Sequence, residues 1–245
     1  MSVVTCTNTK ATMSAADTRQ WLESIVMPLA GELSRAGFFA CLPGPLIRES
    51  VATLRGTSVA VGAQDAWYED GEYTGEDAPS LLAEIGCTDV MVGHADRRAR
   101  GETDELIAKK VAGVHRSGMK PLICIGEAEH LSTREAAEHA VRQLDSATRE
   151  LADTVALRVM YEPAWTVGAA AAAPDHVAAV CAELRQRFAD RGATLTILYG
   201  GGVVSGTYTD LIAAGADIGG MGLGRVTKDR ELLADVLCEI QETAP

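Results

Sequence analysis

Aromatic side chains and clusters of positive charge are both scarce in this sequence. Phe, Trp and Tyr make up 4% of its 245 residues, so a large core has to be built mainly from Ala, Val, Leu and Ile. The formal net charge is −12 and no run of Lys and Arg offsets it, which argues against nucleic acids and anionic membranes as partners. An anionic ligand would therefore need positive potential that its own site supplies, from backbone N–H groups and a few basic side chains.

Cysteine pairs with the spacing of a metal or disulfide motif are also missing. The six cysteines are scattered at Cys6, Cys41, Cys87, Cys124, Cys181 and Cys238. This spacing argues against a zinc site and against a disulfide framework. No apolar run reaches the roughly 18 residues of a membrane span, and no leader-like segment precedes the first apolar run. We therefore expect a soluble cytoplasmic protein without metal or other cofactor.

Short apolar runs alternate with amphipathic stretches along the whole chain. The runs predict strands at residues 2–6, 37–41, 58–62, 89–92, 121–125, 157–161, 194–199 and 217–223. Helical patterns lie between them, for example at 18–29, 106–116, 134–151, 176–188 and 231–240. Eight strand–helix units of roughly 30 residues predict an α/β fold, a parallel (β/α)8 barrel, as a single domain over residues 1–245. An open doubly wound sheet gives a similar pattern, so periodicity alone does not decide whether the sheet closes.

Polar residues and glycines follow several of the predicted strands. In a parallel barrel the chemistry lies at the carboxyl ends of the strands. That rule selects Asn8, Lys10, Gln64, Asp65, His94, Glu127, Glu162, Gly200, Gly201, Gly202, Gly224 and Arg225. The set contains a base, an electrophile, cations and two glycine-rich segments that can cradle an anion. A histidine and a glutamate at the mouth of one site can move a proton between neighbouring carbons.

Several motifs occur together, in one order and spacing. They are Val61–Asp65, Tyr73–Glu76, Val92–Arg98, Gly101–Glu105, Cys124–Glu127, Tyr161–Trp165 and Leu198–Gly201. With these motifs the chain resembles the triosephosphate isomerase family over nearly its full length. The resemblance implies a TIM barrel and a cofactor-free aldose–ketose isomerase that interconverts dihydroxyacetone phosphate and glyceraldehyde 3-phosphate through an enediolate.

The family's well-known mechanism assigns roles to four of these residues. By resemblance, Glu162 is the base and neutral His94 is the electrophile that polarises the substrate carbonyl. Lys10 would supply positive charge and Asn8 a hydrogen bond where negative charge develops. The substrate phosphate would lie against Gly168, Gly201, Gly202, Gly224 and Arg225.

The resemblance also implies a lid and a partner subunit. The segment 163–174 resembles the family's mobile lid, and Glu127 the residue that holds the lid's Trp165 in the open state. The segment 64–77 resembles a protruding loop that docks into a second copy, with Thr74 reaching the neighbouring site. We therefore expect a homodimer that binds a small phosphorylated sugar.

Some residues of the motifs have simpler interpretations. Arg97 and Arg98 are more simply explained as members of a structural ion-pair network with Asp96 and Glu102. Cys124 lies inside an apolar run with no histidine near it in the sequence, so core packing explains it better than nucleophilic chemistry.

The chain departs from the family where the substrate would lie. The departures are Thr9 in place of Trp, Ala95-Asp96 in place of Ser-Glu, alanines in the lid after Gly168, Gly202 in place of Ser, and Arg225 in place of Gly. They keep the proton-transfer residues and alter the contacts to phosphate and lid, as expected if the size or pose of the substrate has changed.

Two alternatives to triosephosphate isomerisation stay open. One is isomerisation of a four-carbon ketose phosphate, of the type L-erythrulose 1-phosphate to D-erythrulose 4-phosphate. The other is a weakly active or inactive barrel that binds a small anion or a partner protein, against which the presence of Asn8, Lys10, His94 and Glu162 argues. Arg225 would either clamp the phosphate or pair with a surface acid, and the acidity of the chain favours the clamp.

Overall fold

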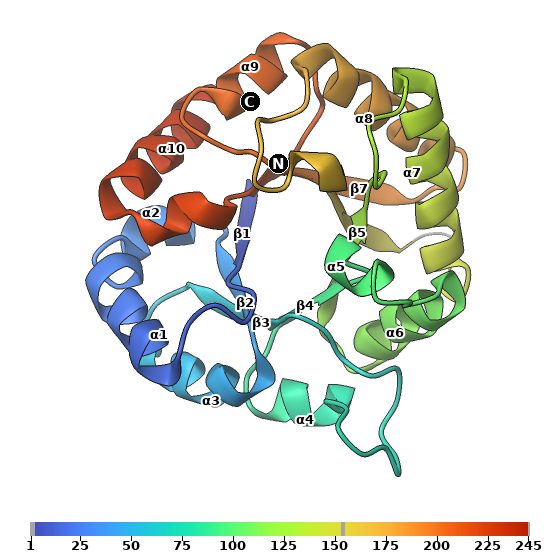
Figure 1. Cartoon of the computed structure of the whole chain (residues 1–245). Helices are drawn as coiled ribbons and strands as arrows, with labels where there is room; N and C mark the ends of the chain where they lie inside the picture. Colours follow the sequence, from blue (N-terminus) through green and yellow to red (C-terminus); the bar gives the residue numbers. More distant parts are fainter. Residues whose placement is uncertain (1–2, 153–154, 245) are drawn as a thin grey trace.

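Eight parallel strands close into a barrel in chain order (Figure 1). The computed structural model describes residues 3–152 and 155–244. Its strands are β1 (Val4–Asn8), β2 (Phe39–Leu42), β3 (Ala60–Ala63), β4 (Asp89–Val92), β5 (Lys120–Ile125), β6 (Ala156–Tyr161), β7 (Thr194–Gly200) and β8 (Gly220–Gly222). Pairing of β1 with β8, Val4 beside Gly220, closes the sheet. The closed barrel confirms the predicted fold class and excludes the open sheet.

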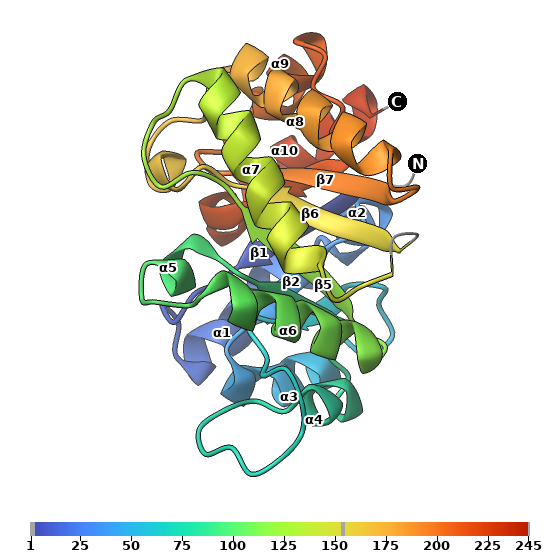
Figure 2. The same ribbon diagram turned by 90° about the vertical axis from the view of Figure 1, so that its right-hand side faces the viewer.

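Helices surround the barrel on its outside (Figures 1 and 2). The α-helices are α1 (Ala15–Trp21), α2 (Ala30–Arg35), α3 (Gly44–Thr53), α4 (Pro79–Glu84), α5 (Ala95–Arg98), α6 (Asp104–Arg116), α7 (Thr133–Thr148), α8 (Pro174–Ala189), α9 (Thr207–Ala213) and α10 (Arg230–Thr243). A π-helical turn, η1 (Leu22–Val26), and two 3₁₀ helices, η2 (Ala164–Thr166) and η3 (Gly224–Lys228), complete them. None of the helices described is long and apolar enough to cross a bilayer.

The barrel separates two apolar cores. The larger one lies between strands and helices and is rich in Leu, Val, Ile and Ala, as the low aromatic content predicted. The smaller one fills the barrel interior with Val4, Cys6, Phe39, Cys41, Met91, Leu122, Cys124, Met160 and Leu198. Five of these nine side chains carry sulfur, so the floor beneath the strand ends is soft and polarisable.

The first helix begins earlier than its periodicity predicted and does not run on unbroken. Ser14 caps α1, since its Oγ accepts the N–H of Asp17 while the Asp17 carboxylate accepts the N–H of Ser14. The sequence Ser-x-x-Asp could have predicted this start. After Trp21 the chain takes the π turn η1, with Met27 N–H bonded to Leu22 O at 2.8 Å.

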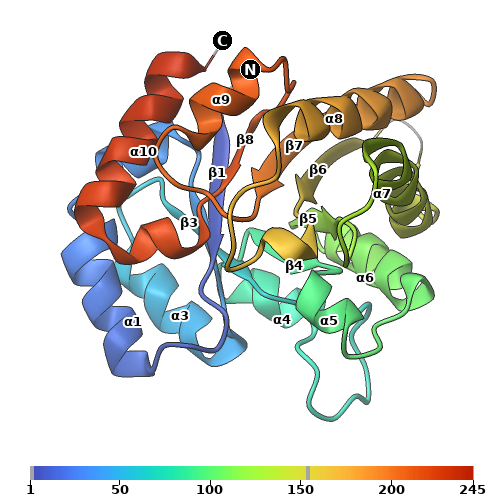
Figure 3. The ribbon, with the colours of Figure 1, turned by 45° about the horizontal axis from the view of Figure 1, so that its top comes forward.

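The strands match the predicted runs to within a few residues. The largest difference is at β8, which spans only Gly220–Gly222 within the predicted 217–223. Ser2, at the start of the predicted strand 2–6, lies outside the described residues. The segment between β3 and α4 projects from the body of the barrel in all three ribbon views (Figures 1, 2 and 3).

Candidate active site

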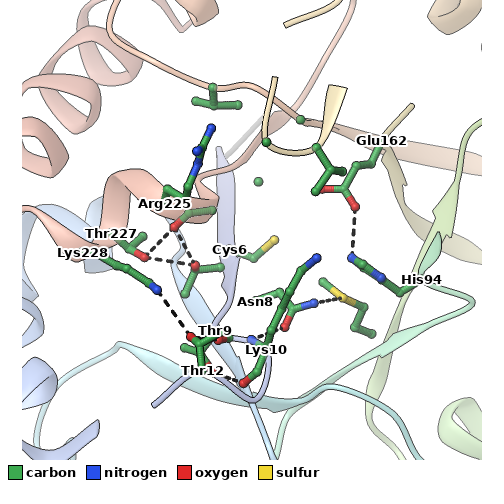
Figure 4. A pocket seen from close by; sticks show the side chains of 18 of the residues that line it. Cys6, Asn8, Thr9, Lys10, Thr12, His94, Glu162, Arg225, Thr227 and Lys228 are labelled. Carbon is green, nitrogen blue, oxygen red and sulfur yellow. Dashed lines mark hydrogen bonds and ion pairs between the residues drawn. The ribbon is translucent and has the colours of Figure 1, made fainter. Parts of the chain in front are cut away.

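A cavity of about 310 Å³ lies at the carboxyl ends of the strands (Figure 4). It brings together all nine residues predicted to form the site. Its lining includes Asn8, Lys10, His94, Glu162, Gly168, Gly201, Gly202, Gly224 and Arg225. These residues come from five of the eight strand ends, so the barrel alone gathers them.

Glu162 and His94 face each other at one side of this cavity (Figure 4). Oε2 of Glu162 lies 3.2 Å from Nε2 of His94. The His94 side chain is 6% exposed and the Glu162 side chain 18%, so the carboxylate is the group open to a ligand. Gly200 makes room for it, because a Cβ there would crowd both Glu162 and Met160. The pair is placed for proton transfer to a molecule bound in the cavity beside it.

The local fold fixes the tautomer of His94. His94 is the N-cap of α5, and its Nδ1 accepts the backbone N–H of Asp96 at 3.0 Å. An imidazole nitrogen that accepts an N–H carries no proton itself. His94 is therefore neutral, with its proton on Nε2, and Nε2–H donates to the Glu162 carboxylate.

Lys10 adopts a backbone conformation that few non-glycine residues adopt, with φ +49°. Side chains hold its peptide groups on both sides. Asn8 Oδ1 accepts the Lys10 N–H at 2.8 Å, and Gln64 Nε2 donates to Lys10 O at 3.0 Å. Strain of this kind persists where surrounding contacts over-determine it, and it gathers at functional sites.

The ammonium group of Lys10 is already paired. Its Nζ lies 2.9 Å from Oδ2 of Asp96. Burial opposes ionisation of Asp96, but the hydrogen bond from Lys10 and the charges around it outweigh burial and lower the pKa of Asp96. Asp96 thus joins Lys10, just after β1, to the helix that His94 caps, and it neutralises part of the positive potential at this side of the site.

The glycines after β7 are required by the close approach of the segment 163–174. A Cβ on Gly201 would collide with Thr166 Oγ1, and one on Gly202 with the backbone of Ala170 and Ala171. Both residues have positive φ, 102° and 61°. This packing on the β6–α8 segment accounts for the glycines without any ligand, although both line the cavity.

The segment 163–174 is tied to Glu127, as the resemblance implied. Trp165 Nε1 donates to Glu127 Oε1 at 3.0 Å, and Tyr161 OH donates to the same carboxylate. Burial and the neighbouring Glu127 raise the pKa of Tyr161, so the phenol stays a donor. At the other end of the segment, Ala172 N–H donates to Tyr199 OH at 2.8 Å.

Two cations at the β8 side of the cavity have no carboxylate partner in the part of the chain that the structure describes. Arg225 and Lys228 both belong to η3 and both line the cavity. Arg225 forms no ion pair there with a surface acid, which was one of the two expectations for it. Lys228 Nζ is 3.4 Å from Thr12 Oγ1.

Sequence reasoning missed several lining residues. Among them are Cys6, Thr7, Met13, Trp21, Met91, Met160, Thr227 and Lys228. Cys6, Met91 and Met160 each lie two or three residues before a predicted site residue. The alternation of side chains along a strand could have predicted that they face the barrel interior. Burial raises the pKa of the Cys6 thiol, which keeps it protonated. Within residues 3–152 and 155–244, no three His, Cys, Asp or Glu side chains are grouped to hold a metal ion.

The arginines after His94 are structural, as proposed. Arg97 binds Asp65 at 2.8 Å and Glu102 at 2.9 Å. Lys110, which is fully buried, binds the same two carboxylates at 2.6 and 2.5 Å. Arg98 binds Asp104 at 2.6 Å. Asp96 stands apart from this network, because it pairs with Lys10.

A family model, two relatives and a solved structure agree on one family. The family model described as triosephosphate isomerase matches residues 3–240. The triosephosphate isomerase of Alkalilimnicola ehrlichii is 38% identical over 222 residues, which cover 84% of this chain and 86% of that protein. That of a Synechococcus species is 33% identical and covers 97% of this chain and 96% of its own. The crystal structure of triosephosphate isomerase from Bartonella henselae superposes with a TM-score of 0.81 at 26% identity and covers 99% of this chain and 100% of its own. The chain therefore belongs to the triosephosphate isomerase family.

Proposed function

We propose that this protein interconverts dihydroxyacetone phosphate and glyceraldehyde 3-phosphate by proton transfer through an enediolate. The observation that carries the proposal is the Glu162 carboxylate 3.2 Å from Nε2 of a neutral His94, in one cavity with Asn8 and Lys10. A carboxylate base beside a neutral donor suits removal of a proton from carbon while the neighbouring carbonyl is polarised.

Each group has a role in this reaction. Glu162 takes the proton from the carbon beside the carbonyl and returns it to the neighbouring carbon. Nε2–H of His94 donates to the carbonyl oxygen and stabilises the charge that develops there. Lys10 and Asn8 add a positive charge and an N–H at the same end of the cavity. No cofactor takes part, because the reaction only relocates protons within the substrate.

The substrate phosphate is assigned to another part of the cavity lining, formed by Gly168, Gly201, Gly202, Gly224 and Arg225. Lys10 is partly neutralised by Asp96 at 2.9 Å, whereas Arg225 has no carboxylate partner among the described residues. A guanidinium in this situation suits a phosphate dianion, which it can bind through two N–H groups.

Turnover in deuterated water tests the proposal. The purified protein should interconvert the two triose phosphates and introduce solvent deuterium at the carbon that receives the proton. Replacement of Glu162 by Gln should abolish both signals. A protein that binds the triose phosphates but neither converts them nor exchanges deuterium would overturn the proposal in favour of an inactive binding barrel.

One observation favours a second candidate, the isomerisation of a four-carbon ketose phosphate. The cavity extends beyond the Glu162–His94 pair to Met13, Trp21 and Thr227. A longer sugar phosphate could occupy that extension while its reacting carbons stay at Glu162. Kinetics on three-carbon and four-carbon phosphates, measured side by side, decide between the two.

We also propose that the protein acts as a homodimer. The segment 64–77 projects from the barrel (Figure 3) and carries a cluster of Trp67, Tyr68 and Tyr73. Tyr73 of this cluster is 37% exposed although it is a large aromatic residue. A second copy that packs on the segment would cover this aromatic surface.

Light scattering tests the dimer. The expected mass is twice the 25.8 kDa of the chain. Replacement of Trp67 by Glu should give monomers, and a monomeric wild-type protein would contradict the proposal. A reducing cytoplasm fits the six free cysteines, five of which are buried. Fractionation of the source cells would test that localisation.

A further inference from the structure

Met91 touches the carboxamide of Asn8 at the floor of the cavity. Asn8 Nδ2 lies 3.3 Å from Sδ of Met91, drawn as the dashed line from Asn8 to a sulfur atom in Figure 4. Met91 is 1% exposed and belongs to the core inside the barrel. Strand β4 therefore reaches the site twice, through the sulfur of Met91 and through His94 just after its end.

The Lys10 N–H identifies which atom of the Asn8 carboxamide is the oxygen. Oδ1 accepts the N–H of Lys10 at 2.8 Å. A flipped amide would place its own donor against that N–H, so Nδ2 has to be the atom that faces Met91. In the chain as described, the sulfur is the one acceptor for Nδ2. A thioether is a weak acceptor, so its effect is on direction more than on overall stability.

The contact leaves one N–H of Asn8 free. An amide nitrogen carries two N–H groups, and Met91 accepts one of them. Asn8 also lines the cavity that holds Glu162 and His94, so the second N–H is available to a ligand there. Rotation about the last side-chain bond of Asn8 would move that N–H away and would also break the contacts to Met91 and Lys10.

We propose that Met91 is a positioning residue for the isomerase reaction. Its sulfur on one side and the Lys10 N–H on the other hold the rotation of the Asn8 carboxamide, so that the free N–H meets the substrate oxygen on which negative charge develops. This inference rests on the proposed function. Its chemistry is specific, because a leucine of similar volume fills the same space but cannot accept an N–H.

Replacement of Met91 by Leu tests the role. The kcat of Met91→Leu should fall about two- to tenfold, the range that one neutral hydrogen bond supplies, with a smaller change in KM. Met119→Leu is the matched control, because Met119 is buried in the outer core and does not line the cavity. In an Asn8→Ala background, Met91→Leu should have no further effect on kcat.

Two kinetic outcomes would overturn the inference. One is a kcat for Met91→Leu equal to that of the wild type. The other is a fall in kcat that is as large in the Asn8→Ala background as in the wild-type background, because Met91 would then act through packing and not through Asn8. A wild-type protein without turnover would instead contradict the proposed function. In that event, NMR of the side-chain amide of Asn8 still tests whether Met91 positions it. The resonances of this amide should shift in Met91→Leu and stay in place in Met119→Leu, and an unshifted Asn8 amide would overturn the positioning role.

Discussion

Nδ1 of His94 accepts the backbone N–H of Asp96, two residues along the chain, at 3.0 Å. The bond exists because His94 caps the short helix α5 and the chain turns at Gly93, with φ +74°. It leaves the proton on Nε2, which faces Glu162. The electrophile of the proposed reaction is thus set by a helix start rather than by another side chain.

Nitrogen-15 NMR can observe this tautomer directly. At neutral pH, His94 should show a protonated Nε2 and an unprotonated Nδ1, because the Asp96 N–H occupies Nδ1. Exposed His115 provides an internal reference, since no such bond fixes its ring among the described residues. A His94 signal with its proton on Nδ1 would contradict the assignment and remove the donor from the cavity.

The second prediction concerns the length of the base. Glu162→Asp should lower kcat about 100-fold or more, because a reacting group displaced by about 1 Å loses near-attack geometry. Stability should change little, since the Glu162 side chain is partly exposed and its backbone bonds remain. Glu183→Asp, on the exposed face of α8, is the matched control. Wild-type turnover in Glu162→Asp would mean that another group is the base.

The third prediction concerns the lid. Trp165→Phe removes the N–H that reaches Glu127 at 3.0 Å and keeps most of the aromatic ring. The described position of the segment 163–174 should lose stability relative to a closed one, so KM should fall and kcat should drop about two- to tenfold as product release slows. Steady-state kinetics with a viscosity series measure this. An unchanged KM and kcat would show that the bond does not bias the lid.

The reactive pair could be predicted from sequence because each member directly follows a buried run and lies in a specific motif. Glu162 and His94 needed no knowledge of barrel closure. Met91 and Lys228 could not be predicted in this way. Met91 contacts Asn8 and Lys228 contacts Thr12 only because the barrel brings distant strand ends together. Likewise, Trp21 Nε1 donates to Thr227 O at 2.7 Å across 206 residues, a contact that no local pattern encodes.

The positions of strands and helices could be predicted from the sequence where local patterns of apolar residues determine them. Parallel strands buried on both faces give clear apolar runs, and seven of the eight runs lie close to the observed strands. Where tertiary packing decides, prediction was less accurate. The π turn η1, in which Leu22 and Val26 are buried, interrupts a continuous helical pattern. In the short strand β8, Gly220 approaches Val4 too closely for any side chain, a contact made across the closure of the barrel.

The fourth prediction is a pH dependence of stability. Burial raises the pKa of Asp65 to about 6, although Lys110 and Arg97 oppose the rise. The folded protein thus binds this proton more tightly than the unfolded chain, whose ordinary value is 3.8. Stability contributed by Asp65 is therefore lost as the pH rises from about 4 to about 6, by about 1–3 kcal/mol.

Urea unfolding of Asp65→Asn across that pH range isolates the effect. The variant loses a partner of Lys110 at every pH, but it cannot titrate. Its free energy of unfolding should therefore rise relative to the wild type by about 1–3 kcal/mol between pH 4 and 6.5. Asp190→Asn, at an exposed helix end, should run parallel to the wild type. Parallel curves for Asp65→Asn would contradict the raised pKa.

The last prediction concerns Arg225. It is exposed at the mouth of the cavity, and among the described residues no carboxylate holds it. Its place on the cavity lining makes it a candidate to bind the phosphate of the ligand. Arg225→Gly should therefore raise KM about tenfold or more, because a charge-assisted bond to phosphate contributes about 1.5–3 kcal/mol. The variant should also shift preference toward the three-carbon pair if Arg225 favours a longer substrate. Arg55→Gly is the matched control, because it changes the net charge equally and lies between α3 and β3, away from the cavity. If KM and the ranking of three- and four-carbon substrates are the same in Arg225→Gly as in the wild type, Arg225 does not bind the phosphate. The backbone N–H groups and Lys228 would then have to supply the positive potential on their own.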